Sequence, residues 1–203
     1  ENRVPADYFA QFEGTDELAG NVVFRSPSFR HHAADGETSA DMIVTAAKTL
    51  TDRHGADYLD DVDVVLTHSQ LPEVPVRGCV GEVAHRLGLR PEVVLDVHNG
   101  GCAAFILLVE LAGDLLRARG ARKALIGLAQ NSAGQIFVQE QVRGKAQASI
   151  PGDGAAVAVL TLSEVGSPVL DTVCRSYGQY SADMTAVSSP ERKYWEAGPG
   201  QIH

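Results

Sequence analysis

The feature that most constrains the fold is an alternation of short, β-branched apolar runs with longer segments of helical periodicity. The run at residues 62–68 (Val-Asp-Val-Val-Leu-Thr-His) is too short for a helix and too apolar for a half-exposed strand, which indicates a buried central strand. Residues 93–97 and 123–129 also predict strands. Amphipathic helices are predicted before or between these runs at residues 38–54, 79–87 and 103–119. This order predicts an α/β fold with a mostly parallel sheet and helices on its faces.

Local signals mark where the three helices begin and end. Thr38 and Asp41 have capping-box spacing at the start of the first helix, and Gly55 lies just past its end. Gly88 and Gly120 follow the second and third helices in the same way. We therefore expect three helices with well-defined ends.

The last third of the chain has a different pattern. Residues 131–151 are polar and rich in Gly and Gln, which suggests a long functional loop or an interface segment. Residues 155–162 and 168–174 each predict a strand, and the short connection at 164–167 favours an antiparallel pair. The periodicity weakens after residue 178.

Composition and charge exclude several classes of protein. The 26 acidic and 17 basic residues give a net charge of −9, so the chain lacks the basic surface of a general nucleic-acid binder. The longest apolar run, residues 103–109, is far shorter than the roughly 20 residues of a membrane span. Three widely spaced cysteines predict neither a disulfide framework nor a zinc site. We expect a cytoplasmic protein without a membrane segment, metal or redox cofactor.

Cys102 is the strongest candidate for chemistry. It lies between the end of a predicted buried strand and the start of a long helix, and ligands of parallel sheets bind at that edge. Gly100 and Gly101 leave room for a substrate to approach the sulfur. A helix N-terminus also stabilises a thiolate, which predicts an activated nucleophile. The alternative is an inert, buried thiol.

The other candidates favour structural roles. Cys79 and Cys174 fall on a helical face and in a strand, where an inert thiol is expected. His68 and His98 lie at or near the ends of strands and can border a pocket, although a hydrogen-bonded structural histidine is favoured for each. Asp153 lies in a glycine turn and is interpreted as a turn residue rather than a catalytic acid.

Several motifs together resemble the ketoacyl synthase III branch of the thiolase superfamily. The principal ones are Asp96-Val97, Cys102-Ala103-Ala104-Phe105, residues 120–127 and Gly152-Asp153-Gly154-Ala155-Ala156. Further matches are residues 63–67, Leu87-Gly88, Arg25, His31, His32 and Glu37. They come in the family's order and at about its spacing, over nearly the whole chain.

The resemblance implies a thiolase-like fold of α-β-α-β-α layers built from two similar halves, with Cys102 as the nucleophile. Residues 1–177 are expected to be the first half, without its first strand, and 178–203 a linker and the start of the second half. The family's catalytic histidine and asparagine, or another polar partner, come from that second half. His203 lies too early to fill that role.

The implied activity is acyl transfer from an acyl-CoA or acyl carrier protein thioester to a malonyl-type carbon nucleophile. The turn at residues 97–101 departs from ordinary fatty-acid initiating enzymes and favours specialised metabolism, polyketide or fatty-acid-like. Alternatives are a hydroxyl or amine acceptor and a non-catalytic ketosynthase-like partner subunit. Arg25 and Arg30 either hold a phosphate of CoA or the phosphopantetheine arm, or are ordinary surface arginines. A homodimer is expected around residues 77–90 and 123–145.

Overall fold

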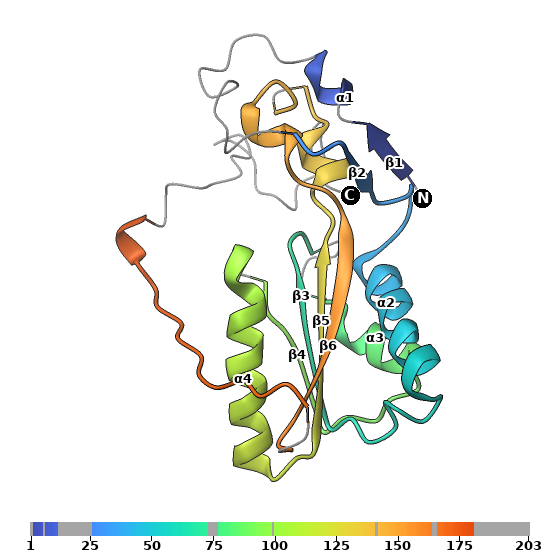
Figure 1. The fold of residues 1–203 in the computed structure, drawn as a ribbon, viewed down its shortest axis with the longest axis vertical. Helices are drawn as coiled ribbons and strands as arrows, with labels where there is room; N and C mark the ends of the chain where they lie inside the picture. Colours follow the sequence, from blue (N-terminus) through green and yellow to red (C-terminus); the bar gives the residue numbers. More distant parts are fainter. Residues whose placement is uncertain are drawn as a thin grey trace.

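The structure is a computed structural model that describes residues 2–5, 7–11, 26–72, 77–98, 100–140, 142–163 and 166–180. Its main body is one sheet covered by helices, and a smaller two-stranded sheet lies at one end (Figure 1). The predicted α/β class is therefore confirmed. The proposed domain boundary at residues 177/178 stays a prediction, because residues 181–203 lie outside the described part.

The main sheet has the strand order β4-β3-β5-β6. Its strands are β3 (Val64–Ser69), β4 (Val93–Asp96), β5 (Lys123–Gln130) and β6 (Gly154–Thr161). β3 pairs in parallel with both β4 and β5, while β6 runs antiparallel to β5. Every residue of β3 is buried, as the apolar run predicted for a central strand.

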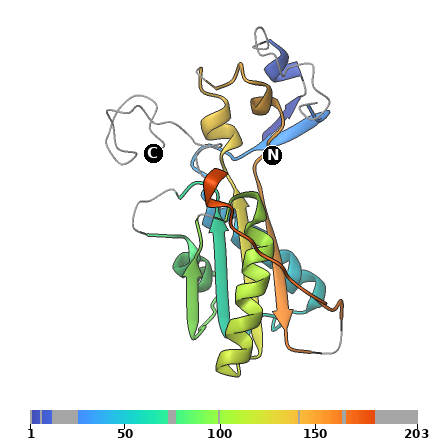
Figure 2. The same ribbon diagram turned by 90° about the vertical axis from the view of Figure 1, so that its left-hand side faces the viewer.

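Helices cover both faces of this sheet. They are α2 (Ser39–His54), α3 (Val80–Arg86) and α4 (Ala104–Arg119). α2 and α3 lie on one face and α4 on the other (Figures 1 and 2). Val64 and Leu66 pack in the cluster that contains α4, whereas Val65 packs in the cluster that contains α2 and α3. The alternation of side chains along β3 therefore builds the two interfaces.

The predicted helix ends are confirmed. The Asp41 backbone N–H donates to the Thr38 hydroxyl oxygen (3.1 Å), and the Thr38 backbone N–H donates to the Asp41 carboxylate (2.9 Å), which completes the capping box. α4 ends at Gly120, whose φ of 64° is the left-handed conformation that glycine adopts at low cost.

The small sheet precedes the main body in sequence. β1 (Asn2–Pro5) pairs antiparallel with β2 (Phe29–His32), and α1 (Asp7–Ala10) follows β1. Phe9 of α1 is 1% exposed and anchors this part of the molecule. Within the described part of the chain, no helix combines the length and the apolar character that crossing a bilayer requires.

The predicted hairpin after β6 is wrong. Residues 168–177 form no strand, and β6 pairs with β5 instead, with Lys123 opposite Thr161. The segment crosses over α4 (Figure 2), and a cavity of about 650 Å³ separates it from α4 and β6. Pro168 cannot donate a ladder hydrogen bond at its start. The predicted loop at 131–151 contains two helical turns, η3 (Ala133–Phe137) and η4 (Ala146–Ser149).

Gly127 tests the packing of α2 on the sheet. A Cβ atom at this position would lie 2.7 Å from Cγ2 of Ile43, which is fully buried. We expect Gly127→Ala to lower the free energy of unfolding by about 1–3 kcal/mol through overpacking, measured by chemical denaturation.

Gly81→Ala is the matched control, because a Cβ atom there meets nothing within 4 Å. Alanine also has the higher helix propensity, so this variant should be at least as stable as the wild type. Equal stability of the Gly127→Ala variant and the wild type would contradict the close packing of Ile43 on β5.

Candidate active site

Cys102 lies at the edge of the sheet where the parallel strands end. β4 ends at Asp96, the short turn η2 (Gly101–Ala103) contains the cysteine, and α4 begins at Ala104 (Figure 1). Cys102 is a free, exposed cysteine, which departs from the inert, buried thiol of the alternative interpretation. Its role as the nucleophile stays a prediction.

Both glycines before Cys102 are required by the backbone. Gly101 has a φ of +52°, in the left-handed region that L side chains rarely adopt. A Cβ atom at Gly100 would lie 2.8 Å from Cα and Cβ of Ala104. The turn thus presents the thiol at the start of α4 with little bulk before it.

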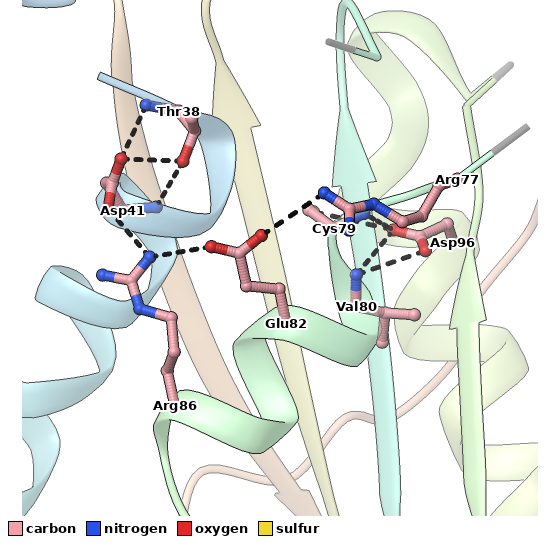
Figure 3. A network of polar contacts seen from close by, with 8 residues as sticks. All are labelled: Thr38, Asp41, Arg77, Cys79, Val80, Glu82, Arg86 and Asp96. Carbon is pink, nitrogen blue, oxygen red and sulfur yellow. Dashed lines mark hydrogen bonds and ion pairs between the residues drawn. The ribbon is translucent and has the colours of Figure 1, made fainter. Parts of the chain in front are cut away.

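Asp96 holds the end of β4 in place. One oxygen of its carboxylate accepts a hydrogen bond from the Thr67 hydroxyl and others from the backbone N–H groups of Cys79 (3.1 Å) and Val80 (3.2 Å). The second oxygen also lies 3.2 Å from the Val80 nitrogen (Figure 3). Asp96 was noted in the sequence only as part of a motif, and these contacts link it to β3 and α3.

The two candidate histidines, His68 and His98, lie in different environments. His68 is buried, its Nδ1–H donates to the Val97 carbonyl oxygen (2.6 Å), and its Nε2 lies 3.4 Å from Oε1 of Gln70. It is therefore the hydrogen-bonded structural histidine that the sequence favoured. His98 is exposed on the segment that leads to Cys102, and its role stays a prediction.

Asp153 joins three segments of backbone. Its carboxylate accepts hydrogen bonds from the N–H groups of Ala33 (2.9 Å), Ala133 (2.7 Å) and Gly134 (2.9 Å). These contacts fix the loop after β5 against the end of β2. They give Asp153 the structural role predicted from its glycine turn.

Of the two arginines and the other two cysteines, Arg30 and Cys174 depart from the expectations. Arg25 lies outside the described residues. Arg30 is 4% exposed and its guanidinium lies 4.5 Å from the centroid of the Phe9 ring, so it is not an ordinary surface arginine. Cys79 is buried just before α3. Cys174 is exposed in a segment without regular structure rather than in a strand, and Glu110 raises the pKa of its thiol by hydrogen bonding.

Asn131 was missed because it fell inside a polar segment that predicted only a loop. It is fully buried directly after β5, where its Oδ1 accepts from the Leu71 N–H (3.0 Å) and its Nδ2 donates to the Leu71 carbonyl (2.8 Å). Nδ2 also lies 3.2 Å from the Ser39 hydroxyl oxygen. A polar residue directly after a buried strand was the available signal.

No metal centre accompanies the cysteine in the described part of the chain. There, His, Cys, Asp and Glu side chains form no group of three or more that is placed to hold an ion.

A family model and several known proteins are similar to this chain. Residues 95–178 match the family described as 3-oxoacyl-[acyl-carrier-protein (ACP)] synthase III. The beta-ketoacyl-[acyl-carrier-protein] synthase III of Jannaschia sp. (strain CCS1) is 32% identical over 62% of this chain and 38% of that protein. The enzyme of the same name from Ehrlichia canis (strain Jake) is 26% identical over 74% of this chain and 46% of that protein.

A solved structure shows the same fold. The beta-ketoacyl-ACP synthase III of Thermus thermophilus has a TM-score of 0.65 and 27% identity, covering 79% of this chain and 48% of that one. The fold is therefore thiolase-like. The chain spans less than half the length of these three relatives.

His32 provides a test of the contacts around Asp153. Burial lowers the pKa of His32 below its ordinary value, the Asp153 carboxylate opposes this shift, and Arg30 adds to it. We expect Asp153→Asn to lower the pKa of His32 further, because the opposing charge is lost. Histidine titration followed by NMR measures the shift.

Asp35→Asn is the control, because Asp35 is exposed on the loop that follows His32. This variant should leave the pKa of His32 unchanged. Because the folded pKa is the lower one, the unfolded chain binds more protons below about pH 6.5, and His32 costs stability as the pH falls through that value. An unchanged His32 titration in Asp153→Asn would contradict this arrangement.

Proposed function

We propose that the whole protein is an acyltransferase whose nucleophile is Cys102, in keeping with the ketoacyl-ACP synthase III-like sequence and thiolase-like fold of this chain. The donor is an acyl-CoA or an acyl carrier protein thioester. The acceptor is a malonyl-type carbon nucleophile, and the product is a β-ketoacyl thioester. The observation that carries this proposal is the exposed thiol on a glycine turn at the edge where the parallel strands end.

The first half of the reaction moves the acyl group onto the protein. The Cys102 thiolate attacks the thioester carbonyl, so that a carbon–sulfur bond forms and a tetrahedral oxyanion develops. Backbone N–H groups, including that of Cys102, stabilise the oxyanion. The intermediate collapses, the bond to the donor sulfur breaks, and CoA or the carrier protein leaves as a thiolate.

The second half regenerates the cysteine. The malonyl-type acceptor loses CO₂, and the resulting carbanion attacks the acyl carbon on Cys102. The carbon–sulfur bond to Cys102 then breaks and the thiolate is restored. A hydroxyl or amine acceptor would give an ester or amide from the same acyl-enzyme, so the acceptor decides between the two activities.

The unusual turn before Cys102 supports a role in specialised metabolism. Exposed His98 and the pair Gly100-Gly101 replace the small, alanine-rich turn that is more frequent in fatty-acid initiation. We also propose a reducing, cytoplasmic setting, because none of the three cysteines forms a disulfide. Arg25 and Arg30 are the proposed contacts for a phosphate of CoA or of the phosphopantetheine arm. For Arg30 this contact requires that the substrate reach its buried guanidinium.

Cys102 acylation is the direct test. We expect the full-length protein, incubated with acyl-CoA donors, to gain one acyl group that peptide mass mapping places on Cys102. Cys102→Ala should lose the adduct, because no other described cysteine is both exposed and at the start of a helix.

Cys174→Ser is the matched control, since it removes an exposed thiol far along the chain. This variant should retain the adduct. Acylation that persists in Cys102→Ala would contradict the proposal, and acylation without product from a malonyl thioester would point to the hydroxyl or amine acceptor. A wild type that accepts no acyl group would favour the non-catalytic partner subunit.

A homodimer is also part of the proposal, with its interface expected around residues 77–90 and 123–145. Residues 123–130 form β5, which is paired on both sides and has no free edge. β4 lies at the edge of the sheet beside α3, and its Val94 and Leu95 are 43% and 41% exposed. The side of the molecule formed by β4 and α3 therefore fits the interface best.

Light scattering tests the dimer. We expect the full-length wild type to have twice the mass of one chain at micromolar concentration. Val94→Lys should shift it towards monomer, because a charged side chain on an edge strand blocks pairing. Arg90→Lys, which preserves the charge next to β4, should leave the mass unchanged, and a monomeric wild type would contradict the proposal.

A further inference from the structure

A network of hydrogen bonds surrounds Asp96, which lies six residues before Cys102 in the sequence. Donors from two other elements converge on this single carboxylate: the Thr67 hydroxyl on β3, and the N–H groups of Cys79 and Val80 at the start of α3. The Cys79 thiol also lies 3.6 Å from the same carboxylate. Figure 3 shows the contacts of Cys79 and Val80 with Asp96. Thr67 is also the register partner of Asp96 in the parallel β3–β4 pair. The end of β4 is therefore joined to the strand beside it and to a helix.

The space around the carboxylate is shaped for it. A Cβ atom at Gly78 would lie 1.9 Å from Oδ2 and 2.1 Å from Cγ of Asp96, distances that no side chain tolerates. Glycine at position 78 is therefore needed for the α3 backbone to approach the carboxylate. The hydrogen bonds of Asp96 with the start of α3 therefore depend on Gly78 as well.

The next residue is held as well. The Val97 N–H donates to the Thr67 carbonyl oxygen (2.8 Å), and the Val97 carbonyl accepts from His68 (2.6 Å). Both peptide groups that leave β4 are thus fixed by β3. The chain then needs only a short segment to reach η2 and Cys102.

We propose that Asp96 is a positioning residue for Cys102. By fixing the end of β4 to β3 and α3, it sets where the segment with Gly100 and Gly101 begins and so where the thiol lies relative to the backbone N–H groups of its own turn. The inference rests on the proposed function, because the position of the thiol matters for the rate only if Cys102 is the nucleophile. Misplacement of a reacting group by about 1 Å costs up to about a hundredfold in rate.

Asp41 provides a matched control within the same molecule. Its carboxylate accepts from the Thr38 N–H (2.9 Å), the Thr38 hydroxyl (2.8 Å) and Arg86 (2.8 Å), so it also fixes the start of a helix (Figure 3). Asp41 lies on α2, and its contacts, including the one with Arg86 on α3, involve neither β4 nor the segment before Cys102. A purely structural effect should therefore appear equally in substitutions at Asp41 and Asp96.

The first experiment compares Asp96→Asn with Asp41→Asn in the full-length protein. The readouts are the rate of Cys102 alkylation by iodoacetamide, resolved by peptide mass mapping, and the kcat and KM for an acyl-CoA donor. Exposed Cys174 is the internal reference for reagent and sample. We expect Asp96→Asn to lower the Cys102 alkylation rate and kcat about tenfold or more with KM within about twofold. Asp41→Asn should lower only the melting temperature.

The second experiment displaces the carboxylate without removing it. Gly78→Ala puts a methyl group where Oδ2 of Asp96 lies and should reproduce the loss seen in Asp96→Asn. Gly81→Ala adds the same methyl group on α3, where nothing lies within 4 Å, and should behave as the wild type. This pair decides the question if Asp96→Asn does not fold.

The outcomes separate the two proposals. Wild-type rates of Cys102 alkylation and turnover in Asp96→Asn and Gly78→Ala would overturn the positioning role, whatever the activity of the protein. Equal losses in Asp41→Asn would overturn it too, because they would show a general effect of stability. If the wild type is never acylated while its Cys102 alkylation still depends on Asp96, the positioning role holds and the proposed function fails.

Discussion

The rest of the structure depends on the burial of β3 on both faces. Val64, Val65 and Leu66 are each 0% exposed, so the strand is stable only where helices cover both sides of the sheet. Successive side chains of β3 point to opposite faces of the sheet. Those on one face pack against α4, and those on the other pack against α2 and α3. Parallel pairing of β3 with β4 and β5 then brings the ends of three strands to one edge.

That edge gathers buried and half-buried polar groups, and each one is hydrogen-bonded to a neighbouring element. Thr67 and His68 lie near the end of β3, Asp96 ends β4, and Asn131 follows β5. Buried polar groups cost free energy unless they are paired, so they link elements that apolar packing alone would leave less defined. The same strand ends that create the candidate active site therefore also specify its geometry.

The sequence was sufficient for the elements whose signals are local. The capping box at Thr38, the helical stripes and the glycine after α4 all depend on residues within one or two turns. The strand after residue 168 was wrong because pairing depends on distant register, and β6 found its partner in β5. The burial of Arg30 and the contacts of Asp96 were not predictable for the same reason, since Phe9, Thr67 and Val80 come from other elements.

Cys102 lies between a rigid helix and a fixed strand end. Downstream, α4 packs on the sheet through Leu108, Ala112 and Leu116, all 0% exposed, so the helix that follows the thiol has little freedom to shift. Upstream, only the short segment after Asp96 connects the thiol to β4. Many apolar contacts hold the helix, whereas a few polar contacts hold the strand end. We therefore expect a substitution at the strand end to move the thiol more, and to disturb core packing less, than a substitution in the helix. If Cys102 is the nucleophile that we propose, the few residues between the helix and the strand end are the ones that set its position.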